Sequence, residues 1–140
     1  MTEIDKLRDE HALLVKIVAR LEHLIGQPKP PPQLHLFALR YELSSTLIGH
    51  LKDQDWVVYP RLLASCDGHV AETARLIIEE MGGLAEAYVE HCEKWSAGAI
   101  AADWEGYCSD SRSFLKALTN RIARETRELY PLLERLDRAA

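Results

Sequence analysis

Apolar side chains recur three and four residues apart along four stretches of the sequence, and this spacing constrains the fold more than any other feature. Residues three or four apart lie on one face of an α-helix, so each stretch predicts a helix with one buried face. No stretch alternates polar and apolar residues as a half-buried strand does. The predicted buried faces are Ile4, Leu7, His11, Leu14, Val18, Leu21 and Ile25; Leu36, Leu39, Leu43, Leu47, His50, Gln54, Val57 and Val58; Val70, Ala74, Ile77, Met81, Leu84, Tyr88, His91 and Trp95; and Phe114, Leu118, Arg121, Glu125, Leu129, Leu132 and Leu136. We therefore expect an all-α fold, an antiparallel up-down four-helix bundle.

Helix start and stop signals separate these stretches. Thr2 and Asp5 have the spacing of a capping box, and Asp103 is placed to cap the fourth helix. The proline-rich residues 28–32 should end the first helix, because proline cannot continue one. Pro60 should kink or end the second helix for the same reason.

Two adjacent glycines, Gly82 and Gly83, interrupt the third apolar pattern. Each costs about 1 kcal/mol relative to alanine inside a helix, so the pair needs a structural reason. Close approach of a neighbouring helix is the reason we favour. Space beside a ligand pocket is the alternative.

Length and charge set the broad class of the protein. A chain of 140 residues is expected to form a single domain over residues 1–140. Its formal net charge of −5 argues against binding to nucleic acid. No apolar run is long enough for a membrane span and no basic stripe is present, so we expect no membrane association. Three cysteines, Cys66, Cys92 and Cys108, are expected to be mostly buried free thiols, which fits a cytoplasmic location.

One sequence frame occurs twice, in the second and the fourth predicted helix. His50 is followed four residues later by Gln54, and Arg121 is followed four residues later by Glu125; each frame then ends in Tyr-Pro. Residues four apart on a helix point the same way. A histidine with a carboxylate one turn later is how a helical bundle presents half of a metal site. In each of these two frames one of the two ligand types is replaced.

The repeated frame, with its Tyr-Pro ends and the first-helix sequence Arg8-Asp9-Glu10-His11, resembles the haemerythrin-like (HHE cation-binding) domain family. The resemblance covers nearly the whole chain. It implies a four-helix bundle with a non-haem di-iron centre, held by one histidine from each helix and by carboxylates from the second and fourth helices. Members of the family carry or sense oxygen, nitric oxide or iron.

Matched position by position to that family, this chain has a degenerate metal site. The ligands that remain are His11, His50 and Glu125. Gln54 stands for the second-helix glutamate, Met81 falls where the third helix should offer its histidine, and Arg121 stands for the fourth-helix histidine. The resemblance thus implies a polar core cluster made of His11, His50, Gln54, Met81, Arg121 and Glu125.

Two states of this cluster are open. In the first, which we favour, an Arg121–Glu125 ion pair has replaced the metal centre, with His11, His50 and Gln54 hydrogen-bonded around it and no cofactor bound. Arginine supplies the positive charge that a buried glutamate needs. In the second, two histidines and one carboxylate bind a single iron or zinc ion.

The function classes follow from these two states. We expect a regulatory or interaction module without a di-iron centre, acting with a protein partner or as a homo-oligomer. Trp56 lies off the buried seam and marks a candidate partner or dimer surface. The alternative is a metal-dependent sensor or carrier of oxygen, nitric oxide or iron. We do not expect an enzyme, because no nucleophile–base pair, phosphate loop or nucleotide fingerprint is visible.

Overall fold

A computed structural model describes residues 2–139, and every regular element within that range is helical. In chain order the elements are α1 (Glu3–Ile25), α2 (Gln33–Asp53), the π-helix η1 (Gln54–Val58), α3 (Tyr59–Leu63), α4 (Gly68–Met81), α5 (Leu84–Lys94), α6 (Ala97–Ala102), α7 (Trp104–Arg124), the π-helix η2 (Glu125–Leu129) and α8 (Tyr130–Ala139). The predicted all-α class is confirmed.

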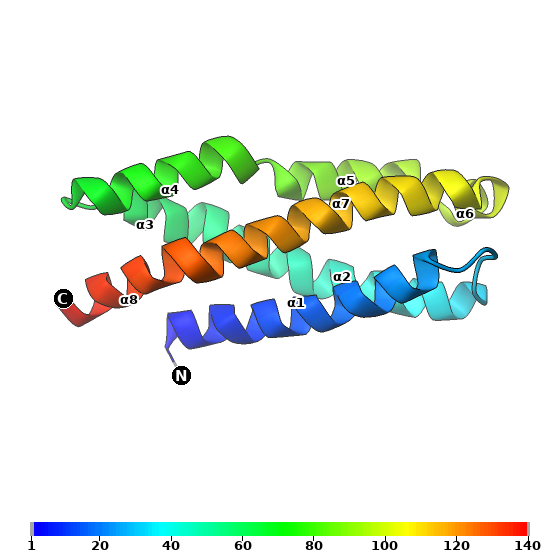
Figure 1. Ribbon diagram of the computed structural model, residues 1–140, viewed down its shortest axis with the longest axis horizontal. Helices are drawn as coiled ribbons and strands as arrows, with labels where there is room; N and C mark the ends of the chain where they lie inside the picture. Colours follow the sequence, from blue (N-terminus) through cyan, green and yellow to red (C-terminus); the bar gives the residue numbers. More distant parts are fainter. Residues whose placement is uncertain (1, 140) are drawn as a thin grey trace.

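The helices lie along one long axis, and the chain reverses direction at each end (Figure 1). α2, η1 and α3 form one continuous helical length, and so do α7, η2 and α8. α1 packs against α2 and α7, while α5 packs against α2 and α7. Where we expected one third helix, the structure has α4 and α5 with a break between them, followed by the short α6.

The helix boundaries follow the predicted signals closely. The Thr2 hydroxyl accepts a hydrogen bond from the Asp5 amide at 3.1 Å, and the Asp5 carboxylate accepts one from the Thr2 amide at 3.2 Å. Asp103 caps α7 by accepting from the Gly106 amide at 2.9 Å. α1 ends before the proline-rich residues 28–32 and α2 begins directly after them. Pro60 is different, because the helical chain runs through it instead of ending.

A polar layer divides the interior into two apolar cores. One core joins the later part of α1 and most of α2 to α5 and α7. The other joins the first turns of α1 to α3, α4 and α8. Five buried polar side chains lie where the two cores meet along α1, along α2–η1 and along α7–η2: His11, His50, Gln54, Arg121 and Glu125. The candidate site is therefore this layer in the middle of the molecule.

The glycine pair breaks the third helical length, for a reason that lies in the backbone. Gly83 has φ +78°, the left-handed region that side-chain-bearing residues avoid. A Cβ added to Gly82 would lie 2.4 Å from the Ile78 carbonyl oxygen. The pair thus ends α4 and starts α5. The close approach of a neighbouring helix that we favoured is wrong, because an added Cβ at Gly82 is nearest to Ile78 and one at Gly83 meets nothing within 4 Å. The two glycines do border a space of about 180 Å³, as the alternative expected.

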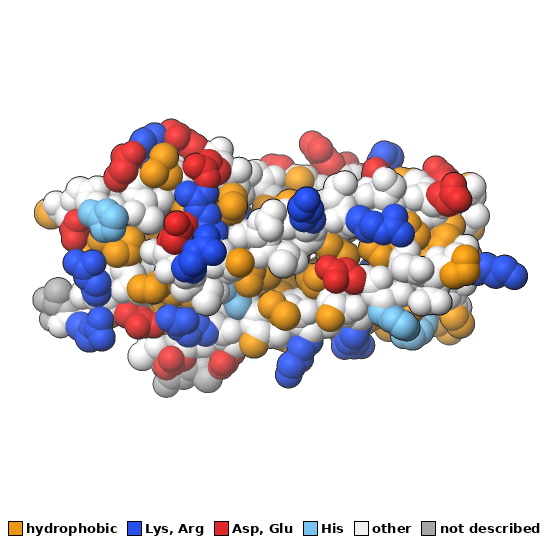
Figure 2. All heavy atoms as spheres, viewed as in Figure 1, with side chains coloured by type: hydrophobic (Ala, Val, Ile, Leu, Met, Phe, Trp, Pro, Cys, Tyr) orange, Lys and Arg blue, Asp and Glu red, His pale blue; other side chains and the backbone are white. Residues whose placement is uncertain are grey.

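The surface of the described chain is mixed in charge. On the face shown in Figure 2, basic and acidic side chains are interspersed and do not separate into areas of one sign. No helix within residues 2–139 is long and apolar enough to cross a membrane. All three cysteines are free, but only Cys108 is buried, so the expectation of mostly buried thiols was wrong. Cys66 is exposed because it lies in the turn after α3.

Replacing Gly83 by alanine should lower the free energy of unfolding by about 1–2 kcal/mol, because the left-handed backbone conformation is unfavourable by that amount for a residue with a Cβ. Gly49 is the matched control: it lies inside α2, and an added Cβ meets nothing within 4 Å. Gly49→Ala should raise the unfolding free energy by roughly 0.5–1 kcal/mol. Urea unfolding followed by circular dichroism measures both. Equal stability of Gly83→Ala and the parent would contradict the left-handed junction.

Candidate metal centre and its polar replacement

Two wide helical turns shape the site, and proline is their cause. Pro60 and Pro131 have no N–H group, and a proline ring clashes with the carbonyl four residues earlier. In response each helix adopts a π turn: the Tyr59 N–H bonds to the Gln54 carbonyl, and the Tyr130 N–H bonds to the Glu125 carbonyl. The predicted kink or end at Pro60 is thus replaced by a widened but continuous helix.

The π turn also shifts side chains around the second helical length. Val57, which we placed on the buried face, is exposed, while Val58 is buried as predicted. Trp56 is 71% exposed, which confirms that it lies off the seam. The Asp55 carboxylate accepts a hydrogen bond from the buried guanidinium of Arg121.

The tyrosines of the two frames cross over to the opposite frame. The Tyr59 hydroxyl donates to Glu125 Oε2 at 2.6 Å. Gln54 Nε2 donates to the Tyr130 hydroxyl at 2.8 Å. Each frame therefore uses its tyrosine to bind the residue that stands at the carboxylate position of the other. This reciprocity ties the second helical length to the fourth.

Glu125 is the centre of the cluster and is 1% exposed. Besides Tyr59, it accepts from Gln54 Nε2 at 3.2 Å and from Arg121 Nε at 3.3 Å. Burial alone would raise the pKa of Glu125, but the contact with His11, the Arg121 charge and the Tyr59 hydrogen bond outweigh it, so the pKa is lowered. Glu125 is consequently an ionised carboxylate inside the protein.

Arg121 is the cation that balances this carboxylate. Its side chain is 3% exposed, and its Nη2 donates to Asp55 Oδ1 at 2.8 Å. Burial lowers the pKa of Arg121, but the Glu125 charge and other acceptors raise it overall, so the guanidinium stays charged. Burial and the Glu125 charge also raise the pKa of Tyr59, which stays a hydrogen-bond donor. The predicted i, i+4 pairing of Arg121 with Glu125 is present at 3.3 Å.

His50 is held from outside the cluster. Its Nδ1 lies 2.8 Å from Glu10 Oε1, and because a carboxylate only accepts, Nδ1 carries the proton. Burial lowers the pKa of His50, so the ring is neutral and Nε2 bears a lone pair. That Nε2 is buried and has no hydrogen-bond partner. We expected His50 to be hydrogen-bonded into the Arg121–Glu125 group, but Glu10 holds it instead.

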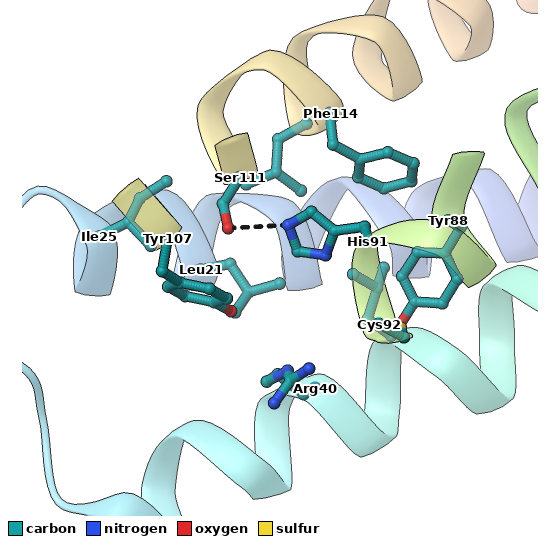
Figure 3. A pocket seen from close by; sticks show the side chains of 11 residues that line it. Leu21, Ile25, Arg40, Tyr88, His91, Cys92, Tyr107, Ser111 and Phe114 are labelled. Carbon is teal, nitrogen blue, oxygen red and sulfur yellow. Dashed lines mark hydrogen bonds between the residues drawn. The ribbon is translucent and has the colours of Figure 1, made fainter. Parts of the chain in front are cut away.

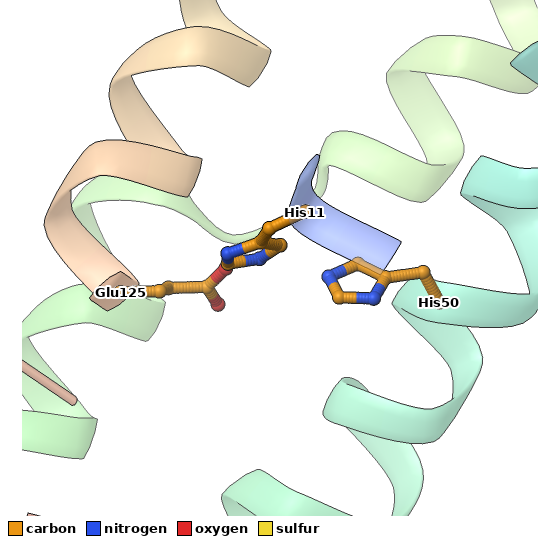
Figure 4. Close-up of side chains that lie close together, drawn as sticks. All are labelled: His11, His50 and Glu125. Carbon is orange, nitrogen blue, oxygen red and sulfur yellow. The ribbon is translucent and has the colours of Figure 1, made fainter. Parts of the chain in front are cut away.

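His11 bridges the other members of the cluster. Its Nε2 lies 2.9 Å from the Tyr130 hydroxyl and 3.4 Å from Glu125 Oε1, and its Nδ1 lies 3.2 Å from Thr126 Oγ1. Its ring packs against the His50 ring with centroids 4.7 Å apart. Figure 4 shows His11, His50 and Glu125 pointing toward one another from three helical lengths. One candidate ligand atom from each lies within 4.8 Å of the others.

A sequence profile of the Hemerythrin HHE cation binding domain matches residues 2–133. The chain belongs to this family. Comparison with curated proteins found no match, and comparison with solved structures found none either. The family that we inferred from the repeated frame, the haemerythrin-like family, is therefore confirmed.

The donor set does not fit the di-iron centre that a haemerythrin-like fold implies. Gln54 offers its amide N–H groups, not a carboxylate, to Glu125 and Tyr130. Arg121 offers only donors and a fixed positive charge. Met81 ends α4, is partly exposed, and forms no hydrogen bond with the other five predicted members of the cluster. The three remaining ligands, His11, His50 and Glu125, are too few for two metal ions.

Sequence reasoning missed five members of this network. Two of them, Tyr59 and Tyr130, were visible in the repeat, because Tyr-Pro follows the carboxylate position by the same interval in both frames. Glu10 stands beside the first-helix histidine in the motif that carried the resemblance. Thr126, which contacts His11, gave no such signal. Asp55 follows Gln54 in the sequence, and its contact with Arg121 depends on the π turn.

A second polar group lies at the far end of the bundle, away from this layer (Figure 3). There His91 Nε2 lies 3.2 Å from Ser111 Oγ, beside Tyr107 and Phe114. Burial, followed by the charge of Arg40, lowers the pKa of His91. The space among these side chains is about 20 Å³, enough for one water molecule.

Tyr59→Phe should lower the free energy of unfolding by about 1.5–3 kcal/mol, because it removes a hydrogen bond to a buried charge without changing the ring. The control is Tyr41→Phe, whose side chain is 75% exposed and which should leave stability unchanged. Chemical denaturation at neutral pH compares the two variants with the parent. An equal loss of unfolding free energy in both variants would show that the 2.6 Å hydrogen bond to Glu125 does not stabilise the fold.

Proposed function

We propose that this chain is an antiparallel up-down four-helix bundle of haemerythrin type that has lost its di-iron centre and works as a regulatory or interaction module. In this proposal the positive charge of a metal is supplied by Arg121. No cofactor is bound and no reaction is catalysed. The single observation that carries the proposal is the environment of Glu125, whose carboxylate is satisfied by Arg121, Gln54 and Tyr59.

The hydrogen bonds around Glu125 support a carboxylate that is paired without a metal ion. A carboxylate has about four lone-pair sites, and hydrogen bonds from three protein donors already occupy three of them. His11 Nε2 stands at 3.4 Å on the remaining side. A metal ion would have to displace these groups, and each displaced donor would then be buried without a partner.

The fixed charge of Arg121 weighs against a metal as well. A divalent ion about 5 Å from the guanidinium would be repelled by roughly 7 kcal/mol at an effective dielectric near 20. Arginine cannot relieve this repulsion by losing its proton. The guanidinium is also held in place by both Asp55 and Glu125.

With no reactive centre, the outer surface carries the function in this proposal. The partner is a protein, either a different chain or a second copy. The net charge of −5 and the interspersed surface charges support a role that involves neither nucleic acid nor a membrane, and we place the protein in the cytoplasm.

Restoring the replaced ligands should create a metal site where the parent has none. Protein made without a histidine tag in iron-rich medium should contain no stoichiometric iron and show no oxo-bridged absorption. The double variant Gln54→Glu, Arg121→His should gain metal, because it supplies two ligands and removes the opposing charge. Elemental analysis with an optical spectrum measures both.

Arg127→His combined with Gln54→Glu is the control, since Arg127 is an exposed residue of η2. It adds a histidine outside the cluster and should bind no iron there. Two irons per chain in the parent protein would refute the proposal.

A second candidate function is a sensor or carrier that uses one iron or zinc ion held by His11, His50 and Glu125. The observation in its favour is the bare, buried Nε2 of His50, whose ring is oriented through Nδ1 by Glu10. Metal-binding histidines are commonly fixed by such a contact. The 3.4 Å between His11 Nε2 and Glu125 Oε1 is close to the separation of two ligands on one tetrahedral zinc, with bonds of about 2.1 Å.

This second candidate makes its own prediction. Zinc should bind with one ion per chain and raise the midpoint of thermal unfolding, and His50→Ala should weaken binding by about 100-fold or more as one of three ligands is lost. His23→Ala, at an exposed position of α1, is the control and should bind as the parent does. Calorimetric titration with zinc measures the affinity of the parent and of both variants. Equal zinc binding by both variants would exclude a site at His50.

A further inference from the structure

A groove on the outside of the molecule lies between α2–η1 and α5, on the elements that are behind α1 and α7 in Figure 1. Its volume is about 570 Å³. The apolar part of its lining comes from Ile48 and Trp56 on one wall and from Ala85 and Val89 on the other. Trp56 is 71% exposed and Val89 is 46% exposed. A large exposed aromatic side chain beside an apolar groove is typical of a docking surface.

The two walls of this outer groove carry opposite charges. Lys52, on the α2 wall, lies over the ring of Trp56 at 5.5 Å and forms no ion pair with any described residue. Glu86 and Glu90, on the α5 wall, also form none within residues 2–139. Asp55 differs, because it is paired with Arg121. The groove therefore presents one free cation on one wall and two free carboxylates on the other, among the described residues.

We propose that a second copy of this chain occupies the outer groove, in a two-fold symmetric dimer. With the symmetry axis along the groove, α2 of each copy lies over α5 of its partner at the same level. Trp56 then enters the apolar groove of the other copy. Lys52 meets the glutamates that stand across the groove from it.

Charge complementarity selects this occupant. A two-fold interface uses the same surface on both chains. This surface has a protruding side chain, Trp56, beside an apolar groove, and it has charges of opposite sign on its two walls. It is therefore complementary to a second copy of itself. A basic helix from another protein would be repelled by Lys52, and an acidic helix would be repelled by Glu86 and Glu90. In the self-complementary arrangement Lys52 of each copy faces glutamates, and the charge of Asp55 on the same wall is balanced by Arg121.

The same face is long enough for a dimer interface. A stable interface needs about 800 Å² from each chain. Tyr41, 75% exposed, lies on the same stripe of α2 as Ile48 and Lys52. It is roughly 22 Å from Trp56 along the helix at 1.5 Å per residue. Exposed aromatic side chains thus stand at both ends of the stripe. The dimer does not depend on whether the polar cluster binds metal.

Sedimentation of the full chain over a wide concentration range tests the dimer. We expect a mass of twice 15.9 kDa that falls to the single-chain mass on dilution. Trp56→Ala should weaken the dimer at least tenfold, because the tryptophan that fills the partner's groove is lost. Val15→Ala, at a 51% exposed position of α1 and outside the groove, should leave it unchanged. A single-chain mass at every concentration would overturn the proposal.

Charge reversal tests the arrangement of the two copies. Lys52→Glu alone and Glu90→Lys alone should each be monomeric, because each symmetric dimer would oppose like charges twice. An equimolar mixture of the two variants should dimerise as the parent does, since both contacts are then between opposite charges. Circular dichroism confirms that each variant is folded. Dimers of either variant alone as tight as those of the parent, or a mixture that stays monomeric, would show that these walls do not meet.

Discussion

The ionised carboxylate of Glu125 is the constraint on which the centre of the structure depends. A charge buried this deeply is unfavourable by several kcal/mol unless it is paired and hydrogen-bonded. The chain meets this need with Arg121 one turn earlier on the same helix and with donors from the second helical length. In a cation-binding fold a metal supplies the balancing charge. Here the protein supplies it from its own side chains.

The Tyr-Pro pairs decide which side chains reach that carboxylate. Because proline cannot donate to the helix, each pair forces a π turn that begins at the carboxylate position of its frame. The tyrosine that follows is buried and crosses to the opposite frame. Two local irregularities thus create a polar layer between two apolar cores. A regular α-helix would not hold Tyr59, Gln54 and Asp55 in this relation.

Asp55 connects the buried layer to the outside of the molecule. Its carboxylate accepts from Arg121, and the same residue lines the outer groove between α2–η1 and α5. The next residue is the exposed Trp56. A change in the charge balance around Glu125 therefore has a direct covalent and hydrogen-bonded route to the groove. In the function that we propose, this proximity would let the charge balance of the buried layer influence the groove.

The sequence by itself determined the helical class, the caps at Thr2 and Asp103, the family, and five of the residues that meet in the centre: His11, His50, Gln54, Arg121 and Glu125. It could do so because helical spacing and local hydrogen bonding depend only on neighbours along the chain. It also carried the Tyr-Pro signal, although the tyrosines' partners could not be read from it. Tertiary structure decided the rest. The break at Gly83 required a left-handed backbone, and Met81 was left outside the hydrogen-bonded cluster. Glu10 orients His50 from 40 positions away, and Asp55 contacts Arg121 from 66 positions away. Such contacts depend on how the helices pack.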